Sequence, residues 1–150
     1  MDKKFYFSCK AVVVHDFRAL VLYRNEEGKR RYDLPGGRIL FGESPDVAVV
    51  RDIRFTVGME VSIVKVIDTF SEQLGQEEQV VGMIYHCEVQ EGNVRLSDYY
   101  DGYEWVEPER LSTCLRGQDL GKRMEAWNWD VILNQSIRWI ERMVEVNMDT

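Results

Sequence analysis

The fold of this chain is decided by the stretch from Leu34 to Met59, LPGGRILFGESPDVAVVRDIRFTVGM. A Pro-Gly-Gly break opens it, and the interior of a helix or strand does not accept that combination. Ser44 is a favourable N-cap residue, and Pro45 suits the first helical position because the amide hydrogen that proline lacks would be unpaired there. These signals predict a helix over residues 45–57, ended by Gly58 in the left-handed conformation.

The predicted helix has two distinct faces. At about 100° per residue, positions 52, 55 and 56 fall together on one face, which we expect to be exposed. The apolar residues are expected to point the other way, into the core: Val47, Val50, Ile53 and Val57.

Short apolar stretches on both sides of the helix are typical of β-strands. They cover residues 11–14, 19–23, 61–66, 80–89 and 103–106, and a shorter run at 94–96 indicates a further strand. The polar segment 71–78 is expected to be a loop. Apolar residues recur at helical spacing at Leu133, Ile137, Ile140 and Val144, which predicts an amphipathic C-terminal helix. This order of elements indicates a mixed sheet with helices packed against it.

The composition is that of one globular domain over residues 1–150, with 45% hydrophobic and 30% charged residues. Against 26 Asp and Glu stand 19 Lys and Arg, which gives a formal net charge of −7. Binding to a nucleic-acid polymer depends on clustered Lys and Arg that neutralise phosphates, so we expect no such partner. A small phosphorylated ligand stays open, because it needs only a local site.

The cysteines favour a reducing compartment. Cys9, Cys87 and Cys114 are odd in number and widely spaced, which is typical of free thiols in the cytoplasm and not of a zinc site. No apolar run has the length of a signal peptide or a membrane span. We therefore expect a cytoplasmic protein that does not contact a membrane.

The stretch that decides the fold resembles the signature of the Nudix hydrolase family. That signature is a Gly, five residues, a Glu, seven residues, and then Arg-Glu-apolar-any-Glu-Glu-any-Gly-apolar. Gly37, Glu43, Arg51 and Gly58 match it in register, and the segment 103–106 resembles a later strand of the family. The resemblance covers residues 4–112 and implies an α/β/α sandwich with a mixed sheet between helices. It also implies hydrolysis of the pyrophosphate in nucleoside diphosphates linked to another group, with Mg²⁺ or Mn²⁺.

The match departs from the family at three positions of the helix. Where the family has three glutamates, this chain has Asp52, Phe55 and Thr56. Three carboxylates on one helix face suit a hard divalent cation, which polarises a phosphoryl oxygen of the substrate. With two of them replaced, the expected metal ligands are Asp52 and the neutral oxygen of Thr56, in a weak site for one metal or in no metal site at all.

By resemblance, the catalytic residues are Asp52, Arg51 and Glu43, although the last two also hold the loop against the helix. The substrate-binding residues are expected to be Gly36, Gly37, Phe55, Tyr99 and Tyr103. As a functional residue, Phe55 would stack on a base or close the former metal pocket. The favoured interpretation is that it packs against a neighbouring loop or partner subunit, because aromatic side chains bury large areas. Nearby acids offer replacement ligands: Glu72, Glu77, Glu78, Asp98 and Asp101.

Two functional hypotheses follow. The first is a hydrolase of the Nudix type whose activity is weak or lost. The second is a non-catalytic domain that binds a nucleotide-type small molecule or a protein partner. Aromatic residues between Trp127 and Trp139 also leave room for a homodimer.

Overall fold

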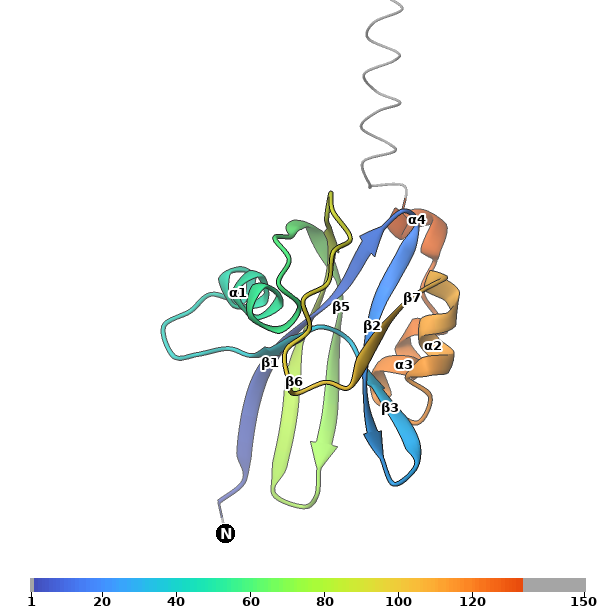
Figure 1. The fold of residues 1–150 in the computed structure, drawn as a ribbon. Helices are drawn as coiled ribbons and strands as arrows, with labels where there is room; N and C mark the ends of the chain where they lie inside the picture. Colours follow the sequence, from blue (N-terminus) through green and yellow to red (C-terminus); the bar gives the residue numbers. More distant parts are fainter. Residues whose placement is uncertain (1, 134–150) are drawn as a thin grey trace, which may run out of the picture.

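The computed structural model describes residues 2–133 and contains a mixed, seven-stranded sheet (Figure 1). Its strands are β1 Lys4–His15, β2 Arg18–Glu26, β3 Lys29–Asp33, β4 Gly36–Arg38, β5 Ser62–Leu74, β6 Glu78–Glu88 and β7 Gly102–Val106. The main order is β3-β2-β1-β6-β5, while β4 pairs with β1 and β7 with β2. β1 and β6 run parallel over their whole length, and the other pairs are antiparallel. The predicted mixed sheet is confirmed.

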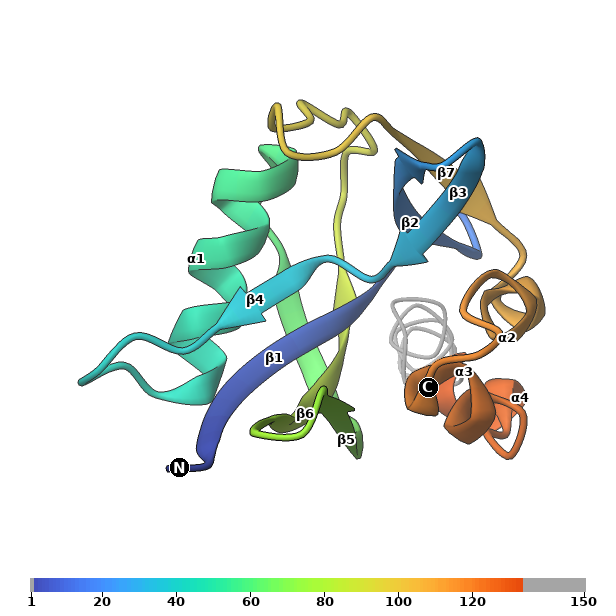
Figure 2. The same ribbon diagram turned by 90° about the horizontal axis from the view of Figure 1, so that it is seen from below.

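Helices lie on both sides of this sheet (Figure 2). One side carries α1, Pro45–Val57. The other side carries the short helices α2 Leu111–Cys114, α3 Asp119–Met124 and α4 Trp129–Leu133, which follow a 3₁₀ turn η1 at Pro108–Arg110. Alternate residues of β1 supply the two cores, Val13 beneath α1 and Val12 beneath α2 to α4. The predicted α/β/α sandwich is therefore confirmed.

β1 and β2 pair only next to the turn that joins them, at His15–Arg18 and Val14–Ala19. Beyond that point the two strands take different partners, because β1 pairs with β4 and β2 with β3 and β7. The divergence places β4 beside residues 8–10 of β1 and leaves the end of β3 close to the same point.

α1 begins and ends where the sequence predicts. Gly58 has φ of 69° and its amide donates to the carbonyl of Arg54 at 3.0 Å. Ser44 has the extended backbone of an N-cap residue, but its side chain makes no capping hydrogen bond. The expectation for Val47 is wrong, because this side chain is 54% exposed in the first turn, whereas Ile53 and Val57 are fully buried.

Two predictions between α1 and β7 are wrong. Most of the polar segment 71–78 is not a loop, since β5 extends to Leu74 and β6 starts at Glu78. Polar residues occur there because this end of the sheet is solvated. Residues 94–96 form no strand; instead the amide of Arg95 donates to Val57 and that of Ser97 to Thr56, both at 2.8 Å. The segment thus satisfies free carbonyls at the end of α1.

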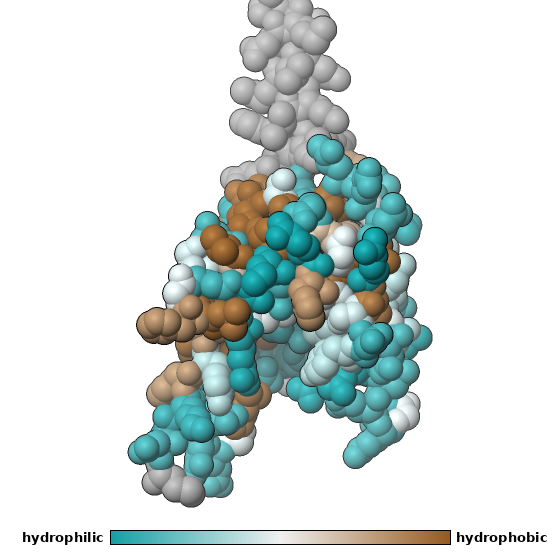
Figure 3. All heavy atoms as spheres, turned by 60° about the vertical axis from the view of Figure 1, so that its left-hand side comes forward, coloured by the Kyte–Doolittle hydropathy of each residue, from teal (hydrophilic) through white to brown (hydrophobic). Residues whose placement is uncertain are grey.

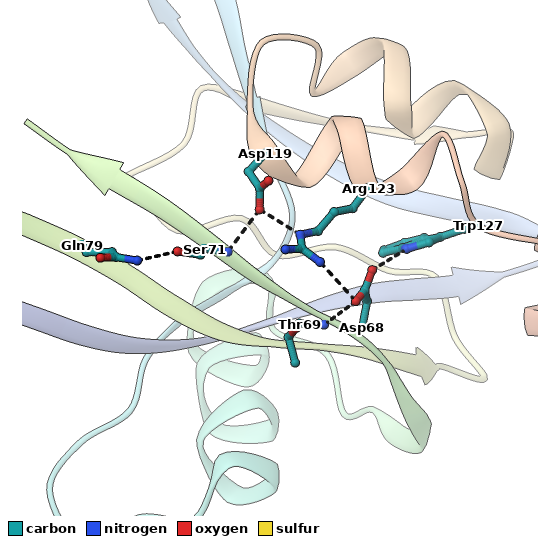
Figure 4. Close-up of polar contacts among 7 residues, drawn as sticks. All are labelled: Asp68, Thr69, Ser71, Gln79, Asp119, Arg123 and Trp127. Carbon is teal, nitrogen blue, oxygen red and sulfur yellow. Dashed lines mark hydrogen bonds and ion pairs between the residues drawn. The ribbon is translucent and has the colours of Figure 1, made fainter.

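A polar network joins α3 to β5 (Figure 4). Oδ2 of Asp119 accepts hydrogen bonds from the backbone amide of Ser71 at 3.1 Å and from Nε of Arg123 at 2.9 Å. Arg123 also pairs with Asp68 at 3.5 Å, and Nε1 of Trp127 donates to that carboxylate at 2.9 Å. These contacts fix the second helical layer against the edge of the sheet.

The predicted C-terminal helix lies mostly outside the described residues, as do Ile137, Ile140 and Val144 of its apolar stripe. Leu133, the first residue of that stripe, belongs to α4 and is the last residue described. Among residues 2–133, no helix has the length and apolar character needed to cross a membrane.

Candidate active site

The loop between β4 and α1 is held by an ion pair between Glu43 and Arg51. Nε and Nη2 of Arg51 donate to the two carboxylate oxygens of Glu43 at 2.6 and 3.0 Å. Glu43 also accepts the amide of Leu40 at 2.8 Å, and Arg51 donates to the carbonyl of Arg38 at 3.2 Å. The hydrogen bond from Arg51 keeps the pKa of Glu43 below its usual range. This two-point contact closes the loop on the helix.

Gly36 and Gly37 allow β4 to lie close to its neighbours. Gly36 has φ of 138°, and a Cβ there would approach the carbonyl oxygen of Cys9 to 2.1 Å. A Cβ on Gly37 would lie 2.8 Å from Oδ1 of Asp52. The backbone of β4 therefore supports the carboxylate of Asp52 directly.

Asp52 projects from α1 into a partly buried position. Burial raises the pKa of its carboxyl, and the charge of Arg51 and the hydroxyl of Thr56 oppose that rise. Oγ1 of Thr56 donates to Oδ2 of Asp52 at 3.4 Å, which is a long hydrogen bond. One carboxylate and one hydroxyl on the same side of the helix are thus in contact.

Helical periodicity predicts one exposed face for positions 52, 55 and 56, and this prediction is wrong. Thr56 is only 7% exposed, because the segment around Ser97 covers the end of α1. Phe55 is 81% exposed and extends into solvent. The space-filling view of this side of the molecule shows apolar groups on its surface (Figure 3), and Leu40, Phe41 and Val47 are also exposed.

A lysine lies beside Asp52, which the sequence did not indicate as a site residue. Nζ of Lys10 on β1 pairs with Oδ1 of Asp33 at the end of β3, at 2.7 Å. Lys10 lies opposite Gly36 in the β1–β4 pair, and its charge, like that of Arg51, opposes the rise that burial causes in the pKa of Asp52. Tyr100 belongs to the same group: burial is the main cause that raises the pKa of its hydroxyl, and the charge of Asp33 is the second. The only sequence signal for this group was a lysine within an apolar strand.

Tyr99 borders the same group. Its ring lies 5.0 Å from that of Tyr100 and is covered by the guanidinium of Arg24 at 4.3 Å. Nη1 of Arg24 also donates to the hydroxyl of Tyr99 at 3.0 Å. Tyr103 is on β7, opposite Leu22 of β2, and is 40% exposed. Both tyrosines are accessible to a ligand.

The donors around Asp52 do not fit the three-carboxylate site implied by the resemblance. Among residues 2–133 there is no group of three or more His, Cys, Asp or Glu side chains placed to hold a metal ion. Glu78 is too far from Asp52 to replace a missing ligand. It pairs with Lys4, and Lys4 lies six residues before Lys10 on β1, a separation of about 20 Å along the strand. Glu72 and Glu77 belong to the same end of the sheet. Asp101 instead accepts the amide of Asn25 at 2.6 Å.

Comparison with known proteins agrees with this architecture. The chain is 25% identical over 101 residues to a MutT-like protein of Streptomyces ambofaciens, a match that spans 67% of this chain but only 62% of that relative. The MutT protein from Methanosarcina mazei Go1 superposes with a TM-score of 0.71 at 23% identity, over 83% of this chain and 96% of that one. The E. coli ORF135 protein gives 0.70 at 17% identity, over 91% and 94% of the two chains. The model of the NUDIX domain matches residues 9–129, and this chain therefore belongs to the NUDIX family.

Proposed function

We propose that this chain is a NUDIX domain that binds a nucleoside-diphosphate-type ligand and hydrolyses its pyrophosphate weakly or not at all. NUDIX hydrolases act on small nucleotide-type substrates and generally use divalent metals. The family therefore supports the class of ligand, and the residues of α1 support the loss of turnover.

The observation that carries the proposal is the environment of Asp52. Of the three family carboxylate positions, one extends a benzyl group into solvent and one is a buried threonine. The remaining carboxylate lies against Gly37 and accepts a hydrogen bond from Thr56. Mg²⁺ in nucleotide sites is usually held by one or two protein carboxylates together with waters and substrate phosphates, and here a single, partly buried carboxylate is left to hold it.

The parts of the site that shape the backbone are intact. The Glu43–Arg51 pair and the close packing of Gly36 on β1 keep the loop in place. Tyr99 and Tyr103 remain exposed beside this framework, although the guanidinium of Arg24 covers one face of the Tyr99 ring. The chain thus keeps the framework and a ligand-facing surface while the metal ligands are reduced.

A second candidate function is binding of a protein partner through the side of the molecule that carries α1. Phe41 in the loop before α1 and Phe55 near the end of α1 are both largely exposed, and large exposed apolar side chains are common on interaction surfaces. A homodimer through this surface is one form of this proposal. Light scattering of the purified protein, compared with Phe55→Ser, tests it: a monomer at all concentrations would contradict the dimer.

Turnover tests the first proposal. The wild-type protein and Asp52→Asn are incubated with Mg²⁺ or Mn²⁺ and a panel of nucleoside diphosphate derivatives, beside an active NUDIX hydrolase as a positive control. Both forms are expected to release product at the same rate, near background. Metal-dependent turnover in the wild type that Asp52→Asn abolishes would contradict the proposed loss of activity.

A further inference from the structure

Lys10 lies outside the signature that the chain shares with the family. It stands on β1 in a segment whose neighbours Cys9 and Ala11 are fully buried. Its side chain is only 16% exposed. A lysine is rarely buried to this extent unless it is paired, so its position needs a partner and a purpose.

The ammonium group of Lys10 is paired with Asp33, and its charge also acts on Asp52. Nζ lies 2.7 Å from Oδ1 of Asp33. Lys10 is paired across the sheet with Gly36, and a Cβ on the next residue of β4, Gly37, would lie 2.8 Å from Oδ1 of Asp52. β1, β3 and α1 therefore each contribute one charged side chain to this region, and the charges of Lys10 and Asp33 both act on Asp52.

Lys10 supplies one positive charge of the chain's own beside these carboxylates. Asp33 is the hydrogen-bond partner of Lys10 within the described part of the chain, and an ammonium has three N–H donors. Two donors are left for a further acceptor. Lysine binds phosphate as a point charge, so these donors suit a phosphate oxygen.

We propose that the Lys10 ammonium, held by Asp33 beside Asp52, is the resident cation of this site and binds the phosphates of a nucleoside-diphosphate-type ligand directly, without a divalent metal. The inference rests on the proposed function for the class of ligand. It adds that recognition of the diphosphate is independent of metal and depends on Lys10.

Calorimetric titration with inorganic pyrophosphate, ADP and adenosine in the presence of EDTA tests this inference. Lys10→Met removes the charge, and Lys10→Gln removes it while keeping a hydrogen-bond donor for Asp33. Lys29→Met is the matched control, because it deletes the same charge from the exposed first residue of β3. Circular dichroism selects the Lys10 variants that retain the fold, and Lys10→Gln serves if Lys10→Met does not.

The wild type and Lys29→Met are expected to bind pyrophosphate and ADP in EDTA with equal affinity. Loss of one charge-assisted contact predicts that the folded Lys10 variant binds both about tenfold or more weakly. Binding that requires Mg²⁺, absence of binding in EDTA, or unchanged affinity in the Lys10 variant would overturn the inference. An equal loss with adenosine would also overturn it, because adenosine carries no phosphate. Turnover in the presence of metal tests only the proposed function. The binding experiment in EDTA can therefore fail or succeed independently of it.

Discussion

The carboxylate of Asp52 lies against Gly37 so closely that a methyl group on Gly37 would approach Oδ1 to 2.8 Å. The two residues come from α1 and β4, and their contact holds the helix on the strand. Because backbone lies on one side and the helix on the other, Asp52 has little freedom to rearrange around a ligand.

Gly37→Ala is therefore expected to destabilise the fold by about 1–3 kcal/mol, the usual cost of an extra group in a packed site. In the Asp52→Ala background the same change should cost markedly less, because the obstructing carboxylate is gone. Urea denaturation of the four proteins measures both costs. An equal loss of stability in the two backgrounds would show that the added methyl group does not clash with the carboxylate of Asp52.

The Glu43–Arg51 pair should make the free energy of unfolding fall at acidic pH. Arg51 lowers the pKa of Glu43 in the folded protein. The carboxyl of Glu43 therefore binds a proton more readily in the unfolded chain than in the folded protein. The stability that the ion pair contributes is fully present above the pKa of the unfolded state and is lost as the pH falls through the pKa of the folded state. Glu43→Gln should flatten the fall of the melting temperature below about pH 4.5.

Thermal denaturation by circular dichroism between pH 3 and pH 7 measures this effect. Glu125→Gln is the control, because it removes the same charge from an exposed position at the end of α3. An acid limb that is identical in the wild type and Glu43→Gln would argue against the pair.

Phe55 and Ile53 differ in exposure although they are two residues apart on α1. Phe55 is 81% exposed, so Phe55→Ser should change the free energy of unfolding of the monomer by less than about 0.5 kcal/mol. Ile53 is fully buried, and Ile53→Ala should cost about 2–5 kcal/mol because it leaves a cavity. A large loss of stability in Phe55→Ser at low protein concentration would mean that Phe55 packs within its own chain.

His86 on β6 is fully buried, and neither ring nitrogen has a hydrogen-bond partner within residues 2–133. Burial, and then the charge of Lys65, lowers the pKa of His86 to about 4. Glu88 lies 3.5 Å from Nε2 and offers an ion pair only to the protonated ring. The unfolded state binds more protons between the two pKa values, so the stability conferred by neutral His86 is lost as the pH falls from 6.5 to about 4.

His86→Leu should remove this part of the pH dependence, which amounts to on the order of 3 kcal/mol. Urea denaturation at pH 7, 5.5 and 4.5 measures it, with the wild type as the reference. The expected result is a variant whose stability changes less over this range than that of the wild type. The same slope in both proteins would show that other groups cause it.

The parts of the fold that follow from local signals could be predicted from the sequence. Ser44, Pro45 and Gly58 mark the ends of α1 because capping depends on a few adjacent residues. The hairpin of β5 and β6 could not be predicted in full, since its polar end is a strand only through pairing along its whole length. The burial of Thr56 depends on a segment about forty residues away, around Ser97, that helical periodicity does not report.

The candidate site divides in the same way. Gly37, Glu43 and Arg51 could be found from their spacing, and the structure shows how they hold the loop. Lys10 could not be found, because its role depends on Asp33 at the end of a different strand. Contacts between strands that diverge leave no periodic pattern in the sequence.

Whether Asp52 still forms a metal site is tested most directly by titrating the wild-type protein and Asp52→Asn with Mn²⁺ and following free Mn²⁺ by electron paramagnetic resonance. With one helix carboxylate, a buried Thr56 and Lys10 as the nearby cation, we expect both proteins to leave the Mn²⁺ signal equally undiminished. A single saturable site per chain in the wild type that Asp52→Asn abolishes would contradict the absence of a firm divalent-metal site.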